Sequence, residues 1–273
     1  MKPVYIFGTG RCGTTHLQRL ITLNSDVWIW GEHDGFLEYF FKGLELYEDG
    51  EGLRTAVFDE PFPEKDEDLA RLVQTEGREL SWLNRLRRDE LRDDLRDLIR
   101  GLFARRIPEG WSRWGFKEPR YRSSNKVPRF LIDMFPECSA ACIFREPAAT
   151  LESIVRSWYP KYLEPSGLND LPEPYKELVS WWTEDLEYFM KLKRLRPDRL
   201  ALIELGEMIE APGKVLERLD LSPRAPEALI TPSRTNIGPS APSEAAIEAM
   251  AASFAPWRGR MTQLYRDALQ HCD

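Results

Sequence analysis

The chain has 273 residues, 42% hydrophobic and 30% charged, so it is long enough to bury a full core and is ordinary for a globular protein. Its net charge of −7 argues against a general nucleic-acid binder, whose surface would be basic, so any anion site must be a local cluster of positive charge. We expect a cytoplasmic protein without stable membrane insertion, because no segment resembles a transmembrane helix, a predicted strand from the third residue leaves no room for a signal peptide, and the four cysteines show no metal spacing.

The first stretch of the chain predicts a strand, a glycine-rich loop and a helix in immediate succession. Val4 to Phe7 is an unbroken apolar run, as in a fully buried parallel strand, and glycines 8, 10 and 13 follow it. Apolar residues then recur at helical spacing from Leu17. In this arrangement backbone N–H groups and a helix N-terminus face an anion, usually a phosphate, and Thr14 and Thr15 add hydroxyl donors.

The loop has the spacing of a phosphate-binding loop but lacks its lysine. Gly8-x4-Gly13 is followed by Thr14, where a nucleoside-triphosphate site would have Lys, and the positive charge lies inside the loop at Arg11. Such a loop suits a phosphate donor without a γ-phosphate. Cys12 also lies here; its thiol could be activated, but we favour a small loop residue.

The second predicted strand, Val27 to Trp30, is followed by Glu32 and His33. Parallel strands end at one edge of the sheet, so we expect both side chains on the same edge as the glycine-rich loop. A carboxylate beside an anion site suits a proton acceptor, and the alternative is a solvated pair that caps the next helix.

Residues from about 43 to 110 differ in composition from the rest. Acidic residues crowd the beginning, and a charged helical pattern follows. We interpret this segment as a helical insertion, either a set of surface helices or a lid that binds the acceptor.

Two further strands, Trp111–Phe116 and Ala140–Phe144, end next to basic residues. Lys117 follows the first and Arg145 the second. A helix is predicted from Pro147, with Leu151, Ile154, Val155 and Trp158 on its buried side and Ser153 two turns along it. An arginine and a hydroxyl can hold one more phosphate, although a surface ion pair and a helix-face serine remain the alternatives.

These motifs resemble the sulfotransferase family, which uses 3′-phosphoadenosine-5′-phosphosulfate (PAPS) as its donor. The run Gly8–Thr15 resembles the family's 5′-phosphosulfate loop, and Arg145-x7-Ser153 matches the spacing of its 3′-phosphate motif. Lys117-Glu118-Pro119 and Trp30–His33 resemble segments of tyrosylprotein-like and bacterial members. The resemblance covers roughly 1–40 and 111–221. It implies an α/β fold with a P-loop-type parallel sheet flanked by helices, as a single domain over 1–273 with the helical insertion within it.

The resemblance also implies roles for individual residues. Glu32 would be the base with His33 as its substitute, and Arg11 and Lys117 would neutralise charge on the leaving group. The residues that would bind PAPS are Gly8, Thr9, Gly10, Arg11, Cys12, Gly13, Thr14, Thr15, Arg145 and Ser153. No metal is required, and the acceptor would be a hydroxyl or amine of a small molecule, a lipid or a carbohydrate.

The sequence departs from the family pattern in two places. Cytosolic sulfotransferases have a catalytic histidine after the third strand, where this chain has Lys117-Glu118-Pro119. The basic adenosine segment near the C-terminus is not recognisable, and Arg234–Ser240 is carried over only as a loop over the cofactor. The alternatives are a P-loop small-molecule kinase and a non-catalytic anion- or nucleotide-binding protein on the same fold.

Overall fold

A computed structural model describes residues 1–49, 88–159, 161, 164, 172–224 and 243–272. The centre of the predicted insertion, 50–87, and the segment 234–240 lie outside these residues. The chain divides into two compact units, one formed by 1–35 with 106–273 and the other by 36–105.

The first unit is built on a five-stranded sheet in the order β2-β3-β1-β4-β5, in which every neighbouring pair is parallel. The strands are β1 (Val4–Gly8), β2 (Val27–Trp30), β3 (Arg113–Lys117), β4 (Ser139–Phe144) and β5 (Leu200–Glu204). The predicted α/β fold with a parallel sheet is therefore confirmed. Because β1 is central and every residue in it is buried, the loop that follows it emerges in the middle of the sheet edge.

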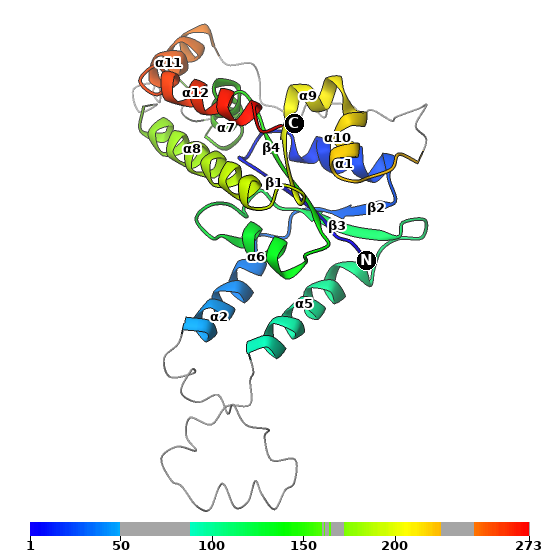
Figure 1. The fold of residues 1–273 in the computed structure, drawn as a ribbon. Helices are drawn as coiled ribbons and strands as arrows, with labels where there is room; N and C mark the ends of the chain where they lie inside the picture. The colour runs from blue at the N-terminus through cyan, green and yellow to red at the C-terminus, as the bar shows by residue number, and fades with distance from the viewer. Residues whose placement is uncertain (50–87, 160, 162–163, 165–171, 225–242, 273) are drawn as a thin grey trace, which may run out of the picture. The chain divides into compact units, whose positions relative to one another are not determined.

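Helices cover both faces of this sheet (Figure 1). They are α1 (Thr14–Asn24), α6 (Val127–Met134), α7 (Pro147–Trp158), α8 (Pro172–Leu195), α9 (Leu205–Glu210), α10 (Pro212–Arg218), α11 (Glu244–Phe254) and α12 (Arg258–Leu269). In Figure 1, α1 and α10 lie on one side of the sheet and α8 and α12 on the other. Helix α1 begins at Thr14, as the glycine-rich sequence predicts.

Alternating residues of β1 pack into two hydrophobic cores, one on each face of the sheet. Val4 and Ile6 belong to an aliphatic cluster with α1 and α10, whereas Tyr5 and Phe7 face aromatic rings. The ring of Phe7 stacks on Phe189 of α8 with centroids 5.9 Å apart. Each fully buried side chain of this size contributes about 1.5–3 kcal/mol, so the strand that presents the loop is held firmly from both sides.

The boundaries of β3 differ from the prediction. The strand was expected over Trp111–Phe116 but runs from Arg113 to Lys117. Its pairing partner β2 begins at Val27, which is opposite Arg113, so no ladder is available to Trp111. Lys117 therefore belongs to the last position of the strand instead of the following turn.

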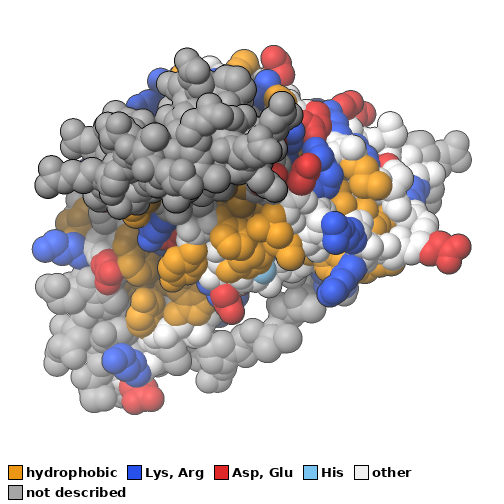
Figure 2. All heavy atoms as spheres, turned by 90° about the horizontal axis from the view of Figure 1, so that it is seen from below, with side chains coloured by type: hydrophobic (Ala, Val, Ile, Leu, Met, Phe, Trp, Pro, Cys, Tyr) orange, Lys and Arg blue, Asp and Glu red, His pale blue; other side chains and the backbone are white. Residues whose placement is uncertain are grey.

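The second unit contains α2 (Leu37–Asp49) and α5 (Arg88–Ala104), which pack on each other. Its aromatic contacts include Phe36 stacked on Phe103, with centroids 6.5 Å apart. Both helices also expose large apolar side chains, among them Tyr39 and Leu46 of α2. Figure 2 shows one face of the molecule, where hydrophobic side chains gather between scattered charged ones. The predicted insertion overlaps this unit, and the single-domain interpretation stays a prediction.

None of the described helices is long and apolar enough to cross a membrane.

Candidate active site

A cleft of about 880 Å³ opens at the carboxyl-terminal edge of the sheet, where open parallel sheets bind ligands. Residues that follow four of the strands meet there with residues of α1, α7 and α9. The lining residues are Gly10, Arg11, Gly13, Thr14, Thr15, His16, Glu32, Pro119, Arg120, Arg122, Arg145, Ser153, Trp158, Leu205 and Ile209. The structure thus brings together at one cleft most of the side chains that the sequence singled out.

The loop after β1 has the backbone conformation of an anion cradle. Gly10, Arg11 and Gly13 all have positive φ angles, of 78°, 50° and 100°. A left-handed conformation is costly for a non-glycine residue, so the one at Arg11 points to a functional constraint. Successive residues of this kind turn backbone N–H groups to a common side, next to the N-terminus of α1.

Apolar side chains pack directly on two glycines of this loop, Gly10 and Gly13. A Cβ atom on Gly10 would lie 3.4 Å from the Trp158 ring, and one on Gly13 would lie 2.6 Å from Leu205 Cδ1. Trp158 was predicted on the buried side of its helix, but it is 50% exposed and lines the cleft. It is the last residue of α7 and lies beyond the turns that pack on the sheet, so the helical spacing of apolar residues misassigned it.

The remaining loop residues do not reach the cleft. Gly8, Thr9 and Cys12 are buried and are not among the described residues that line it. Burial raises the pKa of the Cys12 thiol to about 11. An activated thiol at Cys12 is therefore wrong, and the small-residue interpretation fits the structure.

Arg145 and Ser153 lie at the same cleft, as the spacing of their motif predicts. Arg145 follows β4 directly, and within the described residues its guanidinium has no ion-pair partner. Ser153 Oγ lies 3.3 Å from Nε of Arg11 and accepts a hydrogen bond from it. This bond connects the loop after β1 to the middle of α7.

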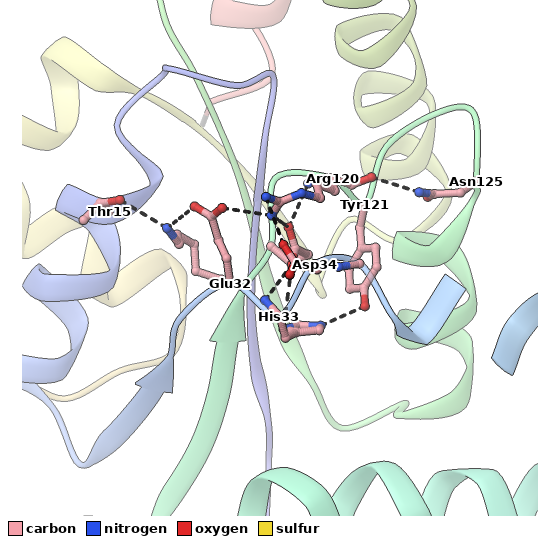
Figure 3. Close-up of polar contacts among 10 residues, drawn as sticks. Thr15, Glu32, His33, Asp34, Arg120, Tyr121 and Asn125 are labelled. Atoms are coloured by element: carbon pink, nitrogen blue, oxygen red, sulfur yellow. Dashed lines mark hydrogen bonds and ion pairs between the residues drawn. The ribbon is translucent and has the colours of Figure 1, made fainter. Parts of the chain in front are cut away.

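Glu32 is held by two cations at the edge of the cleft (Figure 3). Lys117 Nζ lies 2.6 Å from Glu32 Oε1 and 3.2 Å from Thr15 Oγ1, and Arg120 Nη1 lies 2.9 Å from Glu32 Oε2. Partial burial would raise the pKa of Glu32, but the hydrogen bonds and positive charges of Lys117 and Arg120 outweigh it and lower this pKa below its ordinary value. Glu32 is therefore ionised at neutral pH.

The His33 side chain contacts Tyr121 instead of the group formed by Glu32, Lys117 and Arg120. Its Nε2 lies 2.7 Å from the Tyr121 hydroxyl, its ring packs edge-on against Phe116, and it is not one of the residues that line the cleft. Burial lowers the pKa of His33, so the ring is neutral at neutral pH. The geometry separates the two neighbours that the sequence offered as bases.

Two arginines of the cleft were not predicted from the sequence. Arg120 and Arg122 follow β3 and bring positive charge to the side of the cleft that carries Glu32. Arg122 lies over the Trp181 ring, 5.5 Å from its centroid, with Nε 3.8 Å from Asp185. Their position could have indicated this, because both follow a strand that ends at the same edge of the sheet as the glycine-rich loop. With them, four arginines and one glutamate line the cleft, the local positive cluster expected in a chain of net charge −7.

Among the described residues, no three or more His, Cys, Asp or Glu side chains are grouped so that they could hold a metal ion.

Comparison with known proteins identifies the family. The sulfotransferase family matches residues 3–220, about four fifths of the chain. The sulfotransferase domain of the Synechococcus PCC 7002 olefin synthase has a similar fold, with 19% identity, a TM-score of 0.50 and coverage of 93% of this chain and 94% of that one. A sulfotransferase from Alicyclobacillus acidocaldarius gives 16% identity and a TM-score of 0.49, over 97% of this chain and 95% of that one. No curated protein sequence matches. The glycine-rich loop and the basic cleft agree with this family match, and the chain belongs to the sulfotransferase family.

Proposed function

We propose that this sulfotransferase takes its sulfuryl group from PAPS and transfers it to a hydroxyl or amine of a small-molecule, lipid or carbohydrate acceptor. The observation that carries the proposal is one cleft that gathers the loop around Arg11 with Arg145 and Ser153, so that it offers hydrogen-bond donors for two phosphates of one ligand. A donor with phosphates at both ends of its ribose would be such a ligand. ATP has no 3′-phosphate and would leave Arg145 and Ser153 without a phosphate partner. Its γ-phosphate would also require a loop lysine, which this chain does not have.

The reaction in this proposal is an in-line displacement at sulfur. The acceptor oxygen forms a bond to sulfur while the bond from sulfur to the 5′-phosphate oxygen breaks, and 3′-phosphoadenosine-5′-phosphate (PAP) leaves. Arg11, Thr14 and the loop N–H groups would hold the 5′-phosphate and stabilise the charge that develops on it. Lys117 would act beside them, since it is already in contact with Thr15.

Glu32 would accept the acceptor's proton. Its low pKa keeps it ionised, as a proton acceptor must be, but also makes it a weak base. It therefore suits a proton that leaves late, after the forming bond to sulfur has acidified the hydroxyl. His33 is a less suitable base in this scheme because its ring contacts Tyr121 outside the cleft.

The adenine would lie against the apolar wall formed by Trp158, Leu205 and Ile209, which is next to the phosphate loop. A flat aromatic base gains stacking energy from an indole ring. We also keep the prediction that the protein works in the cytoplasm, where its four free cysteines would stay reduced.

A thermal-shift panel tests the donor. PAPS and PAP should raise the melting temperature more than ATP with Mg²⁺ or inorganic sulfate, because a ligand at 100 times its Kd stabilises the fold by about 2.7 kcal/mol. A larger shift with ATP would favour the kinase alternative. Incubation with labelled PAPS and a pooled acceptor library, followed by mass spectrometry, then identifies the acceptor.

A further inference from the structure

Glu118 is a carboxylate with no exposed surface that accepts four hydrogen bonds directly behind the cleft. Its Oε2 accepts from the backbone N–H groups of His33, at 2.9 Å, and Gly35, at 3.1 Å. Its Oε1 accepts from the backbone N–H of Arg120, at 3.2 Å, and from Arg120 Nη1, at 3.0 Å. A carboxylate offers about four acceptor sites, so Glu118 is fully occupied by partners within the protein.

The loop that carries Glu32 is shaped around this carboxylate. Asp34 and Gly35 are consecutive residues with positive φ, of 55° and 70°. Consecutive turned residues of this kind form a concavity of N–H groups that attracts an anion. Here the anion is the Glu118 side chain, because the N–H groups on both sides of Asp34 converge on one of its oxygens.

Each carboxylate oxygen of Glu118 is connected to Glu32 by one hydrogen-bonded neighbour. Oε2 holds the backbone N–H of His33, the next residue in the chain, and so fixes the backbone position of Glu32. Oε1 holds Arg120, whose Nη1 contacts both Glu118 Oε1 and Glu32 Oε2. Figure 3 shows Arg120 between the Glu32 side chain and the loop of His33 and Asp34. Glu118 itself is not among the described residues that line the cleft.

We propose that Glu118 is the positioning residue of the catalytic carboxylate: it orients Glu32 through the 33–35 backbone and through Arg120 without touching substrate. This inference rests on the proposed function, in which Glu32 accepts the acceptor's proton. A proton acceptor must lie within hydrogen-bond reach of the hydroxyl, and misplacement by about 1 Å can cost a hundredfold in rate. Loss of Glu118 should therefore slow turnover and leave donor affinity unchanged.

A double-mutant cycle with Glu32 tests this role. Glu118→Gln places an amide N–H₂ against N–H donors and should lower conversion of PAPS to PAP, measured with a pooled acceptor mixture, by about tenfold to a hundredfold. The Kd for PAPS, measured by calorimetry, should change less than about twofold. In a Glu32→Gln background the same change should lower turnover by less than about twofold, because the residue that Glu118 positions is already gone.

Asp185→Asn is the matched control. Asp185 is a second buried carboxylate, 1% exposed, but it lies on α8 and accepts from N and Oγ of Ser123 at 3.0 and 2.7 Å. Asp185→Asn should change turnover by the same factor in the wild-type and Glu32→Gln backgrounds. Additive behaviour of Glu118→Gln with Glu32→Gln, like that of the control, would overturn the inference and assign Glu118 a purely structural role.

Arg120→Met decides the matter if Glu118→Gln does not fold. Arg120 is half-exposed, so the fold should tolerate its loss. The substitution removes only the connection from Glu118 to Glu32 that runs through the Arg120 side chain. Its effect on turnover should also be non-additive with Glu32→Gln, and additivity would again contradict the inference. A wild-type enzyme that forms no PAP from PAPS with any acceptor would instead refute the proposed donor or reaction, which separates the two failures.

Discussion

At the scale of single residues, the proposed reaction assigns different roles to two charged groups of the cleft: Arg145 would bind the donor and Glu32 would accept a proton. Arg145 has no ion-pair partner among the described residues, whereas Glu32 has two cations. An unpaired arginine is available to an incoming anion, and a doubly paired carboxylate is held in one position. The two residues should therefore respond differently to substitution.

Arg145→Ala should weaken PAPS binding by about tenfold to a hundredfold, because hydrogen bonds to charged groups contribute about 1.5–3 kcal/mol. Adenosine phosphosulfate lacks the 3′-phosphate and should lose much less. Calorimetric titration with both ligands measures the difference, and Arg129→Ala, an exposed arginine of α6, is the control. Equal losses for the two ligands would remove Arg145 from the 3′-phosphate site.

Glu32→Gln should lower turnover by about a hundredfold or more, while the Kd for PAPS stays the same. The amide cannot accept a proton, and Lys117 and Arg120 should keep their places beside it. Steady-state kinetics and PAPS titration of the same preparation provide both numbers. Turnover at the wild-type rate would exclude Glu32 as the base.

Lys117→Met should move the acid limb of the pH profile to higher pH. In the proposed reaction, activity needs ionised Glu32 and is lost as pH falls through its pKa, which Lys117 and Arg120 hold below the ordinary value of about 4.3. Removal of one cation raises that pKa, so loss begins at higher pH. Lys191→Met, at an exposed position of α8, should leave the limb in place. The limb is measured as turnover against pH.

At the scale of elements, α7 begins at a capped N-terminus and carries two residues that line the cleft. Pro147 is its first residue, and the Glu146 side chain accepts hydrogen bonds from the N–H groups of Ala148 and Ala149. The cap therefore fixes the start of the helix that carries Ser153 and Trp158 to the cleft.

Glu146→Ala should lower the free energy of unfolding by about 1 kcal/mol, the usual cost of losing a cap. Glu152→Ala, on the same helix, removes only an i,i+4 ion pair with Arg156 and should cost about 0.3–0.5 kcal/mol. Urea unfolding of both variants compares them directly. An equal, small effect would show that the cap does not limit the stability of this region.

At the scale of the whole molecule, the first unit is organised around β1, which has a neighbouring strand on each side, while β2 and β5 are edge strands. Amides of a central, fully buried strand open only with global unfolding. Native-state hydrogen exchange should therefore show slower exchange in Val4–Phe7 than in Val27–Trp30, whose alternate residues are half-buried. Faster exchange in β1 than in β2 would contradict this order of stability.

The sequence by itself determined β2 and the glycine-rich loop. A four-residue apolar run predicted β2 at its observed bounds, and glycine spacing predicted the turn before α1, because these patterns depend on near neighbours in the chain. The edge of a parallel sheet then placed Glu32 and Arg145 at one cleft without further information.

Only the tertiary structure decided which of two neighbouring residues faces the cleft. Glu32 and His33 are adjacent, yet one pairs with Lys117 and Arg120 and the other with Tyr121. Burial of Glu118 and exposure of Trp158 likewise depend on contacts between segments far apart in the chain. Local periodicity carries no information about such contacts, so the position of the glycine-rich loop and of Arg145 at the cleft could be predicted, whereas the arrangement around Glu32 could not.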